Sequence, residues 1–341
     1  MGSNPIPGSK LTFELKEMFM EFLNKKDSES GFEWKLRLCK LKLIEKYDIE
    51  WQEIVDLLKL DCSADHLRKT AYGLIEYDNY LKSNGVATRI LSISDTHVPF
   101  QLPVKTFREY INKVDVLQLN GDISDCQSIS KFSKKYRVNF VEEMIETRQY
   151  IIDLIEYLKP KKVILNYGNH ELRLQKYFSD KIHDDLLQLM PDTSLDMIID
   201  NGFKNYDKRQ KTEIWYEPIK NVFDIDIEYT KDWKCKIGKT WFAHPRTSSN
   251  GMLKTTEKAI DYFFRIDRDF DSIILAHTHK LCSYIQGDIY MYEQGCCCET
   301  EAMDYTDGLL TVPQQQGFIY VCQNDNGELI YDKTKLMLIS I

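Results

Sequence analysis

The sequence of 341 residues contains no apolar run long enough to span a membrane and no signal-peptide-like apolar core at its start. We therefore expect a soluble, cytoplasmic protein with no membrane partner. Positive charge is also scarce, because 45 Lys and Arg residues are outnumbered by 53 Asp and Glu residues. The net charge of −8 argues against a protein that coats nucleic acid with basic side chains. Nine cysteines without a CxxC pair argue against a disulfide framework or a zinc ribbon.

Apolar, strand-like segments end in clusters of polar side chains at five places in the chain. The segment 163–165 leads to Gly168, Asn169 and His170, and glycine can adopt a backbone conformation that a side chain would forbid. Four further segments end in the same way: 90–94, 116–119, 240–243 and 273–276. Ligands of open α/β sheets usually bind at the carboxyl ends of strands. The polar side chains that follow the five segments are Asp95, His97, Asn120, Asp122, Asp125, Asn169, His170, His244, His277 and His279.

Three carboxylate or amide oxygens and four imidazoles of this group are suited to metal binding: Asp95, Asp122, Asn169, His97, His244, His277 and His279. This set is too large for one four-coordinate zinc and predicts two adjacent divalent ions bridged by a carboxylate. Ligands without thiolate fit manganese, iron or zinc better than calcium, and we favour manganese. Two ions about 3.5 to 4 Å apart can activate a shared water for in-line attack, which predicts hydrolysis of a phosphate ester. His170, outside the set, is placed to stabilise the transition state or to protonate the leaving oxygen.

Five features resemble the calcineurin-like metallophosphoesterase superfamily in their order along residues 90–280: DTH at 95–97, GDISD at 121–125, GNHE at 168–171, His244 and HTH at 277–279. The resemblance implies a four-layer α/β/β/α sandwich with two metal ions. The first ion would be bound by Asp95, His97, Asp122 and His279, and the second by Asp122, Asn169, His244 and His277. By the same resemblance His170 is the catalytic histidine, and Asp125 of the GDISD motif is a second catalytic candidate. The sequences SISKF, EQGCCCET and QQGF resemble a subgroup often encoded by bacteriophages.

One difference from the superfamily narrows the substrate. In the Ser/Thr phosphatases of the superfamily, an arginine that binds the phosphomonoester follows shortly after the last aspartate of the GDxxD motif. In this sequence that aspartate is Asp125, and Cys126 and Gln127 follow it. The difference favours a phosphodiester, which has one negative charge and needs less cationic help. Arg173 and Arg246 are candidates for phosphate binding, with an ordinary surface or helix-pairing role as the alternative. We expect a nuclease; the alternatives are a phosphomonoesterase acting on a phosphoprotein or small metabolite, and a non-enzymatic DNA-binding scaffold.

The chain is expected to divide into an N-terminal helical module, 1–85, and a metallophosphoesterase domain, 86–341. Helical spacing of apolar residues predicts four helices in the module: 11–26, 32–47, 49–60 and 64–82. The segment 51–72 has the proportions of a helix-turn-helix. However, residues 1–89 hold 14 Lys and Arg against 15 Asp and Glu. A helical bundle used for homo-oligomerisation, or for bracing the main domain, is therefore favoured over DNA docking.

In the second domain, alternating strands and helices predict a parallel sheet, with helices at 103–112 and 139–158. A long insertion at about 172–240 is expected to shape the substrate entrance. It contains an expected helix near 181–189 and a strand-rich part over 214–241. Strands expected at 283–292, 317–323 and 329–341 predict a second sheet packed on the first. We interpret Cys296, Cys297 and Cys298 as part of a packed strand rather than a metal site.

Overall fold

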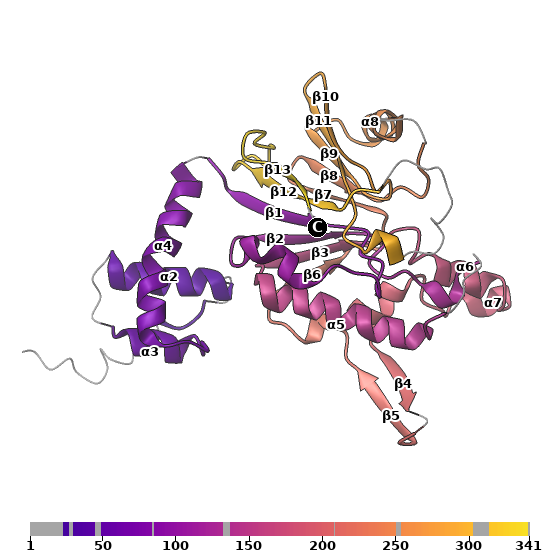
Figure 1. Cartoon of the computed structure of the whole chain (residues 1–341), viewed down its shortest axis with the longest axis horizontal. Helices are drawn as coiled ribbons and strands as arrows, with labels where there is room; N and C mark the ends of the chain where they lie inside the picture. The colour runs from indigo at the N-terminus through magenta and orange to yellow at the C-terminus, as the bar shows by residue number, and fades with distance from the viewer. Residues whose placement is uncertain are drawn as a thin grey trace, which may run out of the picture. The chain divides into compact units, whose positions relative to one another are not determined.

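The computed structural model describes residues 23–26, 30–44, 49–83, 85–131, 137–207, 209–249, 254–302 and 314–339. The chain divides into two compact units, Met1–Leu81 and Lys82–Ile341 (Figure 1). Most of the helix expected at 11–26 lies outside the described residues. Among the helices in the described ranges, none combines the length and the apolar character that crossing a membrane requires.

The described part of the first unit is helical: α2 (Gly31–Leu43), α3 (Trp51–Leu57) and α4 (Ala64–Ser83). Ser30 begins α2 with a capping box, in which its hydroxyl accepts from the Glu33 amide and the Glu33 carboxylate accepts from the Ser30 amide. Ser63 caps α4, since its hydroxyl accepts from the amide three residues further on. Apolar side chains such as Leu38 and Ile54 form a core of this unit alone. Three of the four expected helices, those at 32–47, 49–60 and 64–82, are therefore confirmed in the described ranges.

The larger sheet of the second unit has six strands in the order β13-β12-β1-β2-β3-β6. They are β1 (Thr88–Ile93), β2 (Val116–Asn120), β3 (Lys162–Asn166), β6 (Asp226–Tyr229), β12 (Gly317–Gln323) and β13 (Lys335–Leu338). The pairs β1–β2, β2–β3 and β3–β6 are parallel, which confirms the predicted parallel sheet. β12 pairs antiparallel with β1, and β13 with β12. These two strands therefore extend the first sheet instead of forming the second one.

The other sheet has five strands in the order β10-β11-β9-β8-β7. They are β7 (Lys234–Ile237), β8 (Thr240–Ala243), β9 (Ser272–Leu275), β10 (Leu281–Gln286) and β11 (Ile289–Gln294). The single strand expected at 283–292 is a hairpin, because the chain turns at Gly287, where φ is +61°. The two sheets pack face to face through one core, to which the first contributes Ile90 and Ile164 and the second Phe242 and Ile274.

Helices cover the outer faces and complete a four-layer α/β/β/α sandwich (Figure 1). On the first sheet lie α5 (Phe140–Leu158) and the 3-10 helix η1 (Val104–Tyr110), which replaces the helix expected at 103–112. Asn139 caps α5, and its side-chain oxygen accepts from the Val141 amide. On the second sheet lies α8 (Lys254–Ile266), whose Phe263 packs in one apolar cluster with Ile273. Two short 3-10 helices, η2 (Gln127–Ile129) and η5 (Thr300–Ala302), lie in loops.

Only the first part of the region expected as an insertion, about 172–240, lies outside the two large sheets. That part contains α6 (Arg173–Ser179), α7 (Asp184–Leu187), η3 (Asp196–Asn201), β4 (Phe203–Asp207), β5 (Thr212–Tyr216) and η4 (Ile219–Asn221). β4 and β5 pair only with each other and project from the domain (Figure 1). The second part differs from the expectation, because β6 is the edge strand of the first sheet and β7 and β8 belong to the second.

Candidate metal centre

The carboxyl ends of five strands bring all seven candidate ligands together. Asp95 and His97 follow β1, Asp122 follows β2, Asn169 follows β3, His244 follows β8, and His277 and His279 follow β9. Asn169 and His277 are partly buried, and the other five are buried. Positive φ angles, from 45° to 75°, occur at five of the seven: Asp95, His97, Asp122, His277 and His279. Such left-handed backbone is uncommon for residues other than glycine and clusters at functional sites.

The first predicted ligand group surrounds Asp95. Its carboxylate oxygen Oδ1 lies 3.1 Å from Nε2 of His279 and 3.9 Å from Nε2 of His97. The two imidazole Nε2 atoms are 3.3 Å apart and therefore face one common point. Asp122 Oδ2 lies 4.0 Å from His97 Nε2, at the side of this group. One cation at the common point would be within reach of all four side chains.

The second predicted group shares Asp122 with the first. Its Oδ2 atom lies 3.1 Å from Nε2 of His244, and His277 offers a ligand atom within 4.8 Å of both. His244 Nδ1 lies 2.8 Å from the Asn120 carbonyl oxygen, which can only accept. Nδ1 therefore carries the proton in the neutral ring, and Nε2 is left to face the carboxylates.

One buried atom tests whether these residues fit metal ions. Within the described ranges, Asn169 Oδ1 has no hydrogen-bond partner. Buried polar atoms are rarely left without one, because desolvation without compensation costs about 1 to 3 kcal/mol. Asn169 belongs to the group predicted to bind the second ion. The donor set, two aspartates and an amide with four imidazoles, therefore fits two divalent cations.

Without ions, protons balance the charges of the cluster. Burial opposes a charge on His244, but the carboxylates of Asp122 and Asp95 outweigh it and raise its pKa to about 9. His279 is affected in the same direction, mainly by Asp95. Burial, together with the charge on His244, lowers the pKa of His277 to about 4. Binding of ions would displace protons from the two raised imidazoles.

His170 lies beside the ligand groups and contacts both Asp125 and Arg173. Its Nδ1 atom is 2.9 Å from Asp125 Oδ1, and its Nε2 atom is 2.9 Å from Arg173 Nη2. Arginine can only donate, so Nε2 accepts and Nδ1–H donates to Asp125. A second Arg173 nitrogen donates to the Asp125 carbonyl at 2.6 Å. The exposed Arg246 makes no hydrogen bond or ion pair with a candidate ligand in the part of the chain that the structure describes.

Two buried glutamates, Glu171 and Glu143, support the site. The sequence pattern had predicted a role for neither. The buried Glu171 carboxylate accepts from the amides of Asp122, Ile123 and Ser124, and from that of Gly168. It therefore fixes the loop that carries the shared aspartate. Glu143, on α5, accepts from the Ser124 hydroxyl at 2.8 Å, and burial raises its pKa to about 7. Glu143 could have been found in the sequence, because it is a carboxylate on the apolar face of the predicted helix 139–158.

The structure revises the reasons given for Gly168 and for the cysteine run. Gly168 is required for space rather than for conformation, because a Cβ atom there would overlap the Asp122 carboxylate. Cys296 and Cys298 are buried as expected, but they form isolated bridges instead of a strand. Their sulfur atoms lie in one potential ligand group with His279. A hydrogen bond from Cys298, opposed by burial and aided by His279, lowers the pKa of Cys296 to about 5.

Comparison with known proteins supplies the family. The family model of calcineurin-like phosphoesterases matches residues 88–281. Similar solved structures include vacuolar protein sorting 29 of Cryptosporidium parvum, with 16% identity, a TM-score of 0.36, and coverage of 74% of this chain and 97% of that one. A metallophosphoesterase of Sphaerobacter thermophilus has 11% identity, a TM-score of 0.37, and coverage of 74% and 89%. A search of curated proteins finds no match. With a family match over more than half of its residues, this chain belongs to the calcineurin-like phosphoesterase family.

Proposed function

We propose that this protein is a phosphodiesterase that hydrolyses nucleic acid and depends on two divalent ions, with manganese preferred over iron or zinc. The observation that carries the proposal is the position of Asp122 between two groups of candidate ligands, with His170 beside them. Two ions bound there would lower the pKa of a shared water and stabilise negative charge on a phosphoryl oxygen.

The protein's own residues supply orientation and a proton. Asp125 accepts from His170 Nδ1, which turns the other ring nitrogen toward Asp122, whose Oδ2 lies 3.7 Å away. That nitrogen accepts from Arg173 in this structure, so it can donate to a phosphate oxygen or to the leaving oxygen once Arg173 has moved away and the nitrogen carries a proton. Asp125 is then a positioning residue, because it acts through His170.

Charge near His170 favours a diester. Cys126 and Gln127 are buried, and the Gln127 amide donates to Glu143, so neither residue brings positive charge to a phosphate. A dianionic monoester would need more cationic groups than a monoanionic diester. The cationic side chain that contacts His170, Arg173, already donates to it and to the Asp125 carbonyl.

Arg173 also supports the second candidate function, a phosphomonoesterase. Its side chain is 13% exposed, and its guanidinium group adjoins the candidate catalytic histidine. A small rotation could direct it to a terminal phosphate oxygen, which guanidinium groups bind well. Comparing bis-p-nitrophenyl phosphate with p-nitrophenyl phosphate as substrates separates the two functions, and we expect faster hydrolysis of the diester.

The deciding experiment measures nuclease activity on labelled single-stranded DNA, double-stranded DNA and RNA. Each substrate is tested with Mn²⁺ and with chelator, and the Asp122→Asn variant serves as the control. We expect cleavage that requires both the metal and Asp122. If no polymer is cleaved while p-nitrophenyl phosphate is hydrolysed, the monoesterase replaces the nuclease.

A further inference from the structure

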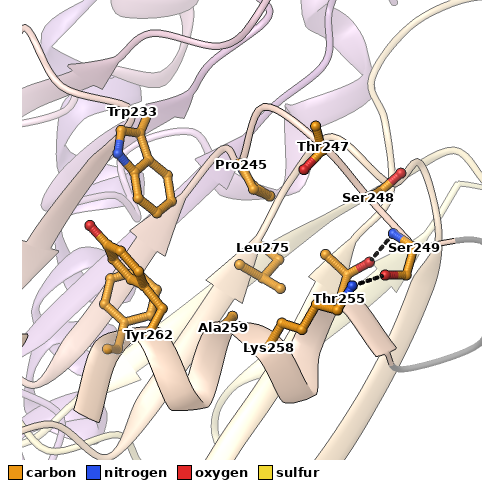
Figure 2. Close-up of a pocket in the computed structure, with 11 residues that line it drawn as sticks. Trp233, Pro245, Thr247, Ser248, Ser249, Thr255, Lys258, Ala259, Tyr262 and Leu275 are labelled. Carbon is orange, nitrogen blue, oxygen red and sulfur yellow. Dashed lines mark hydrogen bonds between the residues drawn. The ribbon is translucent and has the colours of Figure 1, made fainter. Parts of the chain in front are cut away.

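A cavity of about 210 Å³ lies between β9, α8 and the segment that follows β8 (Figure 2). Pro245, in its wall, directly follows the candidate ligand His244, and Leu275 precedes His277 by two residues. Trp233, also in the wall, accepts from the His244 amide through its carbonyl oxygen at 2.8 Å. The chain segments that carry the candidate ligands His244 and His277 therefore also form part of the cavity wall.

One end of the cavity is aromatic. Trp233 and Tyr262 stand there with ring centroids 5.2 Å apart and an interplanar angle of 57° (Figure 2). Phe263 is buried behind them, 6.1 Å from Trp233 between centroids, and anchors both rings to the core. Tyr262 is 39% exposed, so its ring remains accessible. Rings of this kind offer stacking and edge contacts to a planar group.

The other end of the cavity is polar (Figure 2). Ser249 donates its amide to the Thr255 hydroxyl at 2.9 Å, and Lys258 donates to the Ser249 hydroxyl, also at 2.9 Å. Thr247 and Ser248 add two exposed hydroxyl side chains. The described residues that line the cavity include no aspartate or glutamate, although acidic residues outnumber basic ones in the chain. The polar end therefore suits hydrogen-bonding groups on an anionic strand.

Size limits what the cavity can hold. Most small-molecule sites have volumes of about 300 to 1,000 Å³. At about 210 Å³ this cavity is smaller, which suits one ring system rather than a whole nucleotide. A nucleobase matches both of its ends, because a base has a π face for the aromatic rings and a polar edge for the hydroxyl groups and Lys258.

We propose that this cavity is a base-binding subsite for the nucleotide next to the scissile phosphate. The base stacks against Tyr262 and Trp233, and Ser249, Thr255 and Lys258 lie within reach of its polar edge. Hydroxyl groups can both donate and accept, so the subsite tolerates different bases. The inference rests on the proposed nucleic-acid phosphodiesterase function, since it assigns the part of the substrate that flanks the phosphate.

The first test measures binding, so it does not depend on turnover. The full-length protein in chelator is titrated with a short single-stranded oligonucleotide, or with an abasic oligonucleotide of equal phosphate number, and fluorescence anisotropy is recorded. We expect the parent to bind the base-containing strand about tenfold more tightly, as one stacked base allows. Tyr262→Ala should abolish this preference, whereas Tyr262→Phe, which keeps the ring, should retain it. An unchanged preference in Tyr262→Ala overturns the subsite.

The second test separates the subsite from the catalytic function. With Mn²⁺, kcat/KM is compared for thymidine 5′-p-nitrophenyl phosphate and methyl p-nitrophenyl phosphate, which share a leaving group and differ in the base. Tyr262→Ala should lose about tenfold on the thymidine diester, through KM, and remain within twofold on the methyl diester. Equal losses on both diesters overturn the assignment. Hydrolysis of neither diester by the parent refutes the proposed function, while the binding result still decides the subsite.

Discussion

The metal centre and the helix-turn-helix-like pair α3–α4 both contain several charged side chains. In α4 the charges are paired on the exposed surface of one helix, whereas in the metal centre they are buried and come from several strand ends. In α4, Asp65 pairs with Arg68 at 2.7 Å and with Lys69 at 2.6 Å, and all three side chains are more than half exposed. In the centre, Asp122 and His244 are almost fully buried and face a common point with other ligands. Charges that neutralise each other along one helix are typical of a solvated surface. Buried charges from five strand ends that meet at one point indicate a site.

Replacing the shared aspartate, Asp122, is the strongest test of whether the buried charges form a metal site. Asp122→Asn keeps the size of the side chain but removes the charge that both ligand groups share. We expect kcat/KM for a diester to fall at least about 100-fold, since changes outside the ligand shell already cost 10- to 100-fold. Metal content, measured by mass spectrometry of dialysed protein, should also fall. A fully active variant with normal metal content would contradict the role of Asp122.

Replacing His170 should affect the chemistry without emptying the centre. His170→Ala removes the group placed to donate a proton, and a positioned acid contributes about 10²- to 10⁴-fold. We therefore expect kcat to fall by about that factor while metal content stays near that of the parent. His183→Ala is the matched control, because this exposed histidine precedes α7 and lies outside the ligand groups, and it should leave kcat unchanged. Parent-like activity in His170→Ala would remove its assigned role.

Metal affinity should rise with pH. The pKa of His244 is raised to about 9, so at pH 7 the ring holds a proton that an ion must displace. Each displaced proton increases the apparent affinity about tenfold per pH unit, until pH exceeds the pKa of that group. His279 acts in the same direction, whereas His277, with a pKa of about 4, is already neutral. Titrations with Mn²⁺ at pH 7 and pH 8 should differ by at least tenfold; equal affinities would contradict this account.

The position of the candidate ligands at strand ends is predictable from the sequence, because each candidate follows a short apolar strand and this pattern is local. Partnerships between distant segments are less predictable. Nothing local to 317–323 says that this strand pairs with β1 rather than with the second sheet. Likewise, Cys296 approaches His279 only because the chain after β11 returns to the edge where β9 ends. Glu171 was visible in its motif, but three of its four amide donors come from the loop after β2, which only the fold brings to it.

The smallest effect is expected where the charges of α4 already satisfy each other. If α3–α4 does not dock on DNA, the double substitution Arg68→Ala and Lys69→Ala should change affinity for double-stranded DNA less than about twofold, because exposed pairs contribute little. Arg173→Ala provides the comparison at the centre, where the side chain contacts His170 and should affect phosphate binding more strongly. Anisotropy titrations at two salt concentrations measure both effects.

If α4 docks on DNA, the double variant should instead bind all DNA sequences more weakly and show a smaller salt dependence, since each basic contact to phosphate releases counterions. Such a loss in the α4 variant would make the helical unit a nucleic-acid-binding module and reverse the contrast between the two regions.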